Sequence, residues 1–176
     1  MKKISVSFIV FLTLTIFSFS INGKKLLTGL GPELKIKSAG FAFQKPCGWV
    51  HKKSGDGYEI RDKKDQARIY IEAIPDFPKT NIQKEIYMGL VQKVGLKKVV
   101  VKGELIRKKF WDKKTKKNTA LVLDLRGTCM GDGIKLNWQV NIAYAKTTII
   151  SLILIRANNK KLNYIFNAFP QMFTKL

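Results

Sequence analysis

The stretch KLNWQVNIAYAKTTIISLILI, residues 135–155, decides the fold. Residues 135–145 alternate between apolar and polar side chains, and this period of two is typical of a strand with one face on a core and the other in water. Residues 147–155 are apolar at almost every position, which indicates a central strand covered on both faces. In the first strand the expected inward side chains are Leu136, Trp138, Val140, Ile142 and Tyr144, and the expected outward ones are Lys135, Asn137, Gln139 and Asn141.

More strands are expected upstream of this pair. The Gly131-Asp132-Gly133 turn suits a tight hairpin, because its residues tolerate a positive φ, and it follows a strand over 119–129. A strand over 99–110 precedes that one, with a hairpin tip between the two. The other expected strands, bounded by glycine, proline or polar turn residues, are 39–46, 58–61 and 67–74.

Two helices are expected to cover the sheet. The first spans 80–94: Thr80 can cap its start, Gln83 is the capping-box partner three residues later, and Gly95 ends it. The second spans 158–173, with Pro170 near its end. The apolar stripes expected to face the sheet are Ile82, Ile86, Leu90 and Val94 in the first helix, widened by Tyr87 and Val91, and Leu162, Ile165, Phe166 and Phe169 in the second.

The N-terminal residues are typical of an export signal. A positive start, an apolar run and small residues over 1–23 predict a cleaved signal peptide, and an uncleaved membrane anchor is the alternative. No cysteine occurs before Cys47, so a lipoprotein is excluded. We therefore predict a linker over 24–33 and one folded domain over 34–176, located in the periplasm or outside the cell. The domain class is α+β: a twisted antiparallel sheet of six or seven strands with helices packed on it.

Two cysteines in an exported chain raise the question of a disulfide. Cys47 and Cys129 either form a bridge, which an oxidising compartment would preserve, or remain two separate thiols. The single histidine, His51, does not complete a catalytic or zinc-binding pattern with them.

The charge balance is the most unusual property of the sequence. Thirty-three Lys and Arg against 12 Asp and Glu give a net charge of +21. The densest group of cations surrounds two adjacent aromatic residues at the expected hairpin tip, over 107–117. Its side chains either form a solvated turn that prevents edge pairing or bind an anion. The candidate anion-binding residues are Arg107, Lys108, Lys109, Phe110, Trp111, Lys113, Lys114, Lys116 and Lys117.

The order of elements resembles the PsbP-like fold, an α/β/α sandwich. The residues that carry the resemblance are Gly40-Phe41-Ala42-Phe43-Gln44-Lys45-Pro46 with Gly48-Trp49, the helix after Pro78, and Ile165-Phe166-Asn167-Ala168-Phe169. The family includes extrinsic subunits of photosystem II and small exported bacterial proteins. The resemblance implies a noncatalytic subunit or adaptor and transfers no functional residue.

These observations predict an exported, noncatalytic binding protein that engages an anionic envelope polymer, lipid headgroups or an acidic protein, with no cofactor or metal. One alternative is an assembly subunit that docks on an acidic envelope protein, through the polar face of residues 135–145. Another is an exported hydrolase using acids near Asp124, with Asp132 approaching it in space.

Overall fold

A computed structural model of the chain describes residues 30–75, 77, 84–112, 117–144 and 147–175. The predicted export signal therefore lies outside the described residues. In chain order the elements are β1 (Leu30–Ile36), η1 (Lys37–Ala39), β2 (Phe41–Pro46), β3 (Val50–Ser54), β4 (Gly57–Arg61), β5 (Ala67–Ile74), α2 (Lys84–Lys93), β6 (Lys97–Asp112), β7 (Lys117–Gly131), β8 (Ile134–Tyr144), β9 (Thr148–Arg156), η2 (Lys160–Leu162), α3 (Tyr164–Ala168), η3 (Phe169–Met172) and β10 (Phe173–Lys175).

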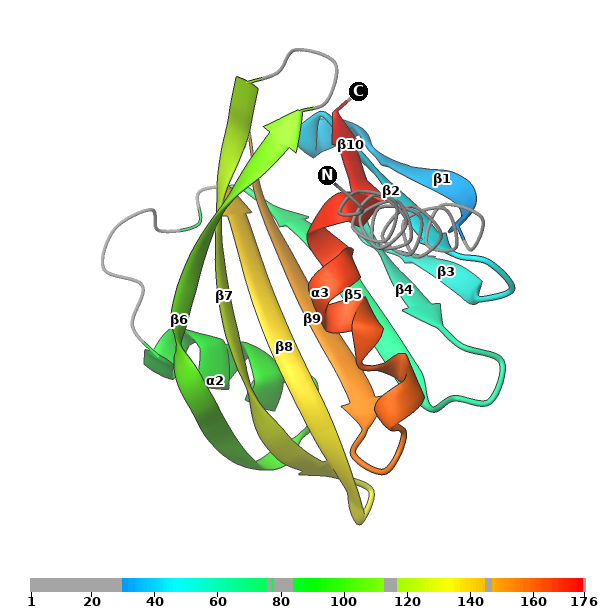
Figure 1. The fold of residues 1–176 in the computed structure, drawn as a ribbon, viewed down its shortest axis with the longest axis vertical. Helices are drawn as coiled ribbons and strands as arrows, with labels where there is room; N and C mark the ends of the chain where they lie inside the picture. The colour runs from blue at the N-terminus through cyan, green and yellow to red at the C-terminus, as the bar shows by residue number, and fades with distance from the viewer. Residues whose placement is uncertain (1–29, 76, 78–83, 113–116, 145–146, 176) are drawn as a thin grey trace, which may run out of the picture.

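The architecture is an antiparallel sheet with material on both faces, so the α+β prediction is confirmed. Seven strands run in the order β3-β4-β5-β9-β8-β7-β6, and a smaller sheet has the order β1-β2-β10. The helix α2 packs on one face of the large sheet, while α3 and the small sheet cover the other (Figure 1). Every strand pair in both sheets is antiparallel.

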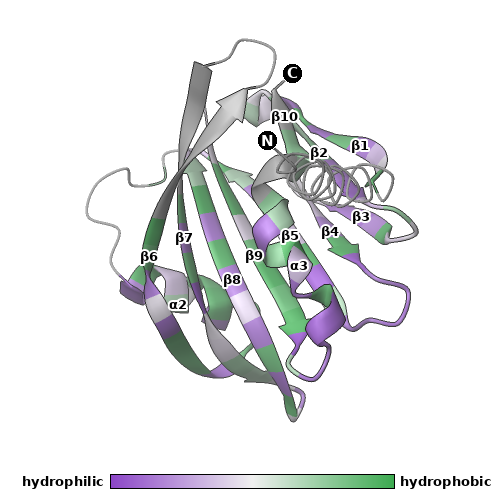
Figure 2. Cartoon of the chain, in the orientation of Figure 1, coloured by the Kyte–Doolittle hydropathy of each residue, from purple (hydrophilic) through white to green (hydrophobic). Residues whose placement is uncertain are grey.

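β9 lies at the centre of the large sheet and is buried from Thr148 to Ile155, as predicted. Figure 2 shows its largely hydrophobic course. Its alternate side chains serve two cores because successive residues of a strand point to opposite faces. Ile149, Ile153 and Ile155 join the core beneath the small sheet and α3, and Ile150, Leu152 and Leu154 join the core beneath α2.

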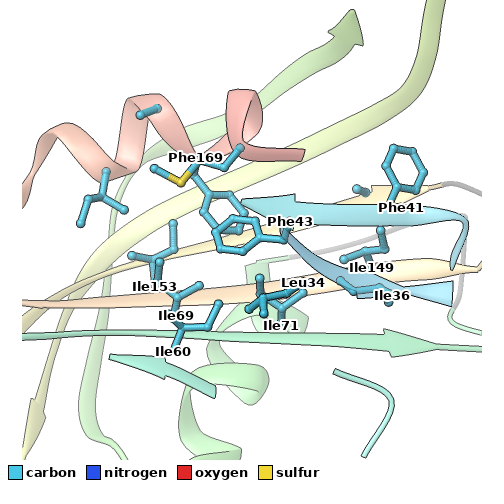
Figure 3. Packing of buried hydrophobic residues seen from close by; sticks show 14 of the residues in the cluster. Leu34, Ile36, Phe41, Phe43, Ile60, Ile69, Ile71, Ile149, Ile153 and Phe169 are labelled. Atoms are coloured by element: carbon cyan, nitrogen blue, oxygen red, sulfur yellow. The ribbon is translucent and has the colours of Figure 1, made fainter. Parts of the chain in front are cut away.

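The core beneath the small sheet gathers large side chains from segments far apart in the sequence. Phe43 on β2 is fully buried, and its ring centroid lies 5.4 Å from that of Phe169 and 5.1 Å from that of Phe173. Below them, aliphatic side chains of β4, β5 and β9 meet the two phenylalanines Phe43 and Phe169 (Figure 3). This packing attaches the small sheet to the large one.

The prediction for the polar face of β8 is wrong. Gln139 is fully buried and Asn141 is 3% exposed, because α3 lies over them. The Gln139 amide Nε2 donates hydrogen bonds to the Phe166 carbonyl oxygen at 3.2 Å and to Asn141 Oδ1 at 2.7 Å. The wet docking face expected over 135–145 is therefore covered along its middle, although the predicted inward residues Trp138, Val140 and Ile142 are buried.

The predicted C-terminal helix is broken into shorter elements. Two 3-10 turns flank the five residues of α3, and the chain then enters β10, where Phe173 pairs with Phe43 of β2. Pro170 lies inside η3, and its ring removes an N–H donor and disfavours a regular helix. The expected buried side chains Ile165, Phe166 and Phe169 are nevertheless buried.

One boundary differs from expectation, because β1 begins at Leu30, inside the segment predicted as a linker.

The buried face of α2 also differs from expectation. The fully buried residues of the helix are Tyr87 and Val91, whereas Val94, predicted to face the sheet, follows the last helical residue and is 42% exposed. The helix therefore faces the sheet with Tyr87 and Val91, which were expected only at the edge of its apolar face. Gly95 ends α2 in the left-handed conformation, with φ 81°, and its N–H donates to the Gln92 carbonyl at 2.8 Å. The predicted cap residues Thr80 and Gln83 lie outside the described residues.

Candidate anion-binding surface

The described part of the basic segment predicted at a hairpin tip, residues 107–112 and Lys117, lies on the paired ends of β6 and β7. The last pair between β7 and β8 is Leu121 with Tyr144. The pairing of β6 with β7 continues beyond that point, through Phe110 with Ala120 to Asp112 with Lys117. We call residues 107–120 the basic arm. Residues 107–109 still lie opposite the part of β7 that pairs with β8, and residues 110–112 and 117–120 extend past the end of β8 as a two-stranded ribbon (Figure 1).

Six of the nine predicted anion-binding residues lie in described strands. Arg107, Lys108, Lys109, Phe110 and Trp111 belong to β6, and Lys117 opens β7. Lys113, Lys114 and Lys116 lie outside the described residues. The backbone therefore brings the six described residues of the predicted set to the paired ends of two neighbouring strands.

The basic arm continues a cationic edge of the sheet. β6 is the outermost strand, and its 16 residues contain six Lys or Arg and two acidic residues. At about 3.3 Å per residue the strand is roughly 50 Å long. Lys97, Lys98 and Lys102 are exposed along it. Ion pairs between described side chains join only Arg68 to Glu59 and Asp65, so these three lysines have no carboxylate within 4.0 Å in the described part of the chain.

The two acids proposed for a hydrolase do not meet. Asp124 is fully buried on β7, on the face that α3 covers, and pairs in register with Asn141. Asp132 is exposed in the β7–β8 turn with φ 49°. Eight residues of extended chain separate them, which corresponds to about 26 Å. The prediction that these two carboxylates approach each other is therefore wrong.

The sequence analysis missed a row of polar side chains beneath α3, in which Asp124, Gln139 and Asn141 are buried and Arg126 is half-buried. Arg126 of β7 lies opposite Gln139 of β8, and its Nη2 donates to Asn167 Oδ1 at 3.0 Å. Its guanidinium carbon also lies 5.7 Å from the centroid of the Phe166 ring. Polar residues at alternate positions of both strands signalled a common face, but not the helix that covers it.

The two cysteines are free thiols, so of the two alternatives for Cys47 and Cys129 the structure has the separate thiols and not the bridge. Cys47 is exposed in the turn after β2, which the Trp49 N–H closes by donating to the Pro46 carbonyl at 3.2 Å. Cys129 is 2% exposed in the core beneath α2, on the opposite face of the large sheet. Burial raises the pKa of the Cys129 thiol to about 11.

This difference predicts the reactivity of the two thiols. Since the thiolate is the reactive form, a raised pKa and burial both slow the reaction of Cys129. At a pH of about 8, a chromogenic disulfide reagent is expected to modify one thiol per folded chain, and Cys47→Ser is expected to abolish that fast phase. Unfolding in denaturant is expected to release the second thiol. A chain with no titratable thiol in denaturant would show that the bridge exists after all.

Within the described residues, no helix is both long and apolar enough to cross a membrane. In the same part of the chain, no three His, Cys, Asp or Glu side chains gather where they could hold a metal ion.

Comparisons with known proteins identify the fold. No family model and no curated protein matches the sequence. The structure is similar to the solution structure of cyanobacterial PsbP (CyanoP) from Synechocystis sp. PCC 6803, with a TM-score of 0.59 and 14% sequence identity. The match covers 82% of this chain and 92% of that one. At this identity the likeness concerns the fold alone, and it confirms the PsbP-like architecture that the sequence predicted.

Proposed function

On the premise of this PsbP-like fold, we propose that the protein is a noncatalytic binding protein that engages an anionic partner through the basic arm. The observation that carries the proposal is the continuation of the β6–β7 ribbon beyond the last pair with β8, Leu121 with Tyr144. Arg107, Lys108 and Lys109 stand in register at the end of the sheet, opposite Leu123, Val122 and Leu121, and Lys117 opens β7 on the ribbon beyond it. A partner that binds at this end of the sheet would therefore meet several cationic residues along one hairpin. The chain is exported in this proposal, which places the arm in the periplasm or outside the cell.

The charge of the chain favours a polyanion as the partner. With a net charge of +21, the protein is surrounded by a positive potential that attracts anions from a distance and is screened by salt. Anionic polymers of the cell envelope and anionic lipid headgroups both present the repeated negative charges that an extended row of lysines can match. Phe110 and Trp111 add two aromatic side chains to the arm, suited to a stacking or interfacial contact.

Replacing the four lysines of the tip tests the proposal. In Lys113→Gln, Lys114→Gln, Lys116→Gln and Lys117→Gln combined, the arm loses four charges. At about 1 kcal/mol for each lysine near an anionic surface, affinity for vesicles rich in anionic lipid is expected to fall on the order of 100- to 1,000-fold. Heparin retention is expected to shift to lower salt. Vesicle sedimentation and a heparin salt gradient measure the two effects.

A control with the same charge change separates the arm from the bulk charge. The matched variant carries Lys52→Gln, Lys53→Gln, Lys97→Gln and Lys98→Gln, all at exposed positions on β3 and β6 outside the arm. It is expected to lose several-fold less affinity than the arm variant. Equal losses in the two variants would show that the charge acts diffusely and that the arm is not the site. Binding to an envelope extract that survives high salt would instead favour docking on an acidic protein.

A further inference from the structure

A cavity of about 190 Å³ lies at the end of the large sheet opposite the basic arm. The end of α2, the first residues of β5, the last residues of β9 and the β7–β8 turn enclose it. Gly131 on its wall is ten residues along β7 from Leu121, where the arm leaves the sheet, which corresponds to about 33 Å. The cavity is therefore separate from the arm.

The strand register explains how the cavity acquires an apolar floor and basic neighbours. Leu136 of β8 lies opposite Arg156 of β9, and Leu154 of β9 lies opposite Arg68 of β5. Residues directly opposite one another in an antiparallel sheet point to the same face. Leu154 belongs to the core beneath α2, and Leu136 packs against the same core. The side chains of Arg68 and Arg156 therefore leave the sheet on the face that α2 covers. Leu96, from the loop after α2, completes the apolar floor.

Two large apolar side chains at this cavity remain open to solvent. Val94 at the end of α2 is 42% exposed, and Ile134 at the start of β8 is 37% exposed. Burying such side chains is favourable in proportion to the apolar area removed from water. An apolar body that enters the cavity would cover part of both.

The guanidinium of Arg68 is already paired with other side chains of the protein. Its Nε donates to Asp65 Oδ1 at 2.6 Å, and its Nη2 donates to Asp65 Oδ2 at 2.5 Å. Its Nη1 lies 3.4 Å from the Tyr70 hydroxyl and 3.8 Å from Glu59 Oε1. The hydrogen bonds from Arg68 lower the pKa of the Asp65 carboxyl, so that this carboxylate stays ionised and is neutralised by Arg68.

Arg156, the other arginine at this cavity, has no carboxylate within 4.0 Å of its guanidinium in the described part of the chain. Its side chain is half-buried, so its N–H groups can bind a carboxylate that enters the cavity. Asp132, the other acid on the cavity wall, is exposed on the turn. Four lysines within two residues of wall residues in the sequence are exposed, namely Lys63, Lys64, Lys93 and Lys97.

We propose that this cavity binds a small carboxylate with an apolar body, whose carboxylate meets Arg156 and whose apolar part covers Leu96, Leu136 and Leu154. An apolar cavity of about 150 Å³ accepts a benzene ring, so the volume here suits a ring or short chain that carries one carboxylate. The guanidinium can bind both oxygens of a carboxylate at once. The site is additional to the polyanion binding proposed for the arm.

Titrating the full protein, labelled with ¹⁵N, with benzoate and separately with benzyl alcohol tests the site. Both probes are expected to shift the amide signals of Val94, Gly95, Leu96 and Leu136. In Arg156→Gln, benzoate is expected to bind at least about tenfold more weakly, while benzyl alcohol binds as before. Benzoate binding that shifts other segments only, or that is unchanged in Arg156→Gln, would overturn the proposal.

Two more variants separate the site from general charge and from altered folding. Arg61→Gln removes an exposed arginine that lies opposite Arg68 but outside the cavity wall. Benzoate is expected to bind this variant as tightly as it binds the unmodified chain.

Gly131→Ala would place a Cβ 2.7 Å from Leu96 Cδ2 and 3.2 Å from Leu136 Cδ1, so these side chains must move. It is expected to weaken both probes several-fold in a chain whose spectrum stays dispersed. Equal benzoate losses in Arg61→Gln and Arg156→Gln, or unchanged binding of both probes by Gly131→Ala, would contradict the proposed site.

Discussion

Gly127→Ala is expected to destabilise the fold by about 3 kcal/mol or more, the upper range for overpacking a close contact. A Cβ at this position would lie 1.9 Å from the Val100 carbonyl oxygen and 2.6 Å from two ring atoms of Trp138. Trp138 lies directly opposite Gly127 and is fully buried, and its Nε1 donates to the Thr128 carbonyl at 3.2 Å. Neither the β6 backbone nor the indole can withdraw without loss of buried contacts.

The same substitution elsewhere provides the control. Gly89 lies inside α2 with nothing within 4 Å of the position that a Cβ would occupy. Because alanine is the better helix former, Gly89→Ala is expected to stabilise the chain by about 0.5 to 1 kcal/mol. Urea unfolding of the two variants measures both free energies. Effects of the same sign would show that the close approach of β6, β7 and Trp138 at Gly127 is not real.

Phe43→Ala is expected to lower the free energy of unfolding by about 3 to 5 kcal/mol, the usual range for truncating a buried phenylalanine. Phe43 is fully buried between the small sheet and the large one, and its ring contacts that of Phe169 (Figure 3). It also contacts the ring of Phe173. Its loss leaves a void that β2, η3 and β10 all border. Thermal or urea unfolding measures the effect.

Tyr164→Ala is the matched aromatic truncation. Tyr164 is 48% exposed on α3, so its loss is expected to change stability by no more than about 0.5 kcal/mol. If Phe43→Ala were as mild as Tyr164→Ala, the small sheet would not depend on the aromatic core that joins it to the rest of the fold.

Much of the fold follows from local patterns. The strand predicted over 67–74 has the bounds of β5, and β9 was recognised as central because its residues are apolar on both faces. A period of two, however, reports only that the two faces of a strand differ chemically. This pattern predicted that Gln139 and Asn141 face water. In the structure, α3 covers them, and its Phe166 carbonyl oxygen accepts a hydrogen bond from the Gln139 amide.

Features that depend on long-range contacts could not be predicted in this way. β10 exists because Phe173 meets Phe43, 130 residues earlier in the chain, while the local sequence favoured a continued helix. Cys47 lies in an exposed turn after β2 and Cys129 in the core beneath α2, a difference that no spacing in the sequence reveals. The cavity at Arg156 depends on the register of β8 with β9, in which Arg156 meets Leu136. The basic arm was predictable because its charges are contiguous in the sequence.

Lysine footprinting tests most directly whether the arm binds the anionic partner. The folded chain is acetylated at low reagent concentration with and without heparin, and the modified lysines are identified by mass spectrometry. The account predicts that heparin protects the arm lysines, Lys113, Lys114, Lys116 and Lys117, at least several-fold more than it protects Lys52 and Lys53 on β3. Uniform protection over all these lysines, or protection of β3 alone, would contradict it.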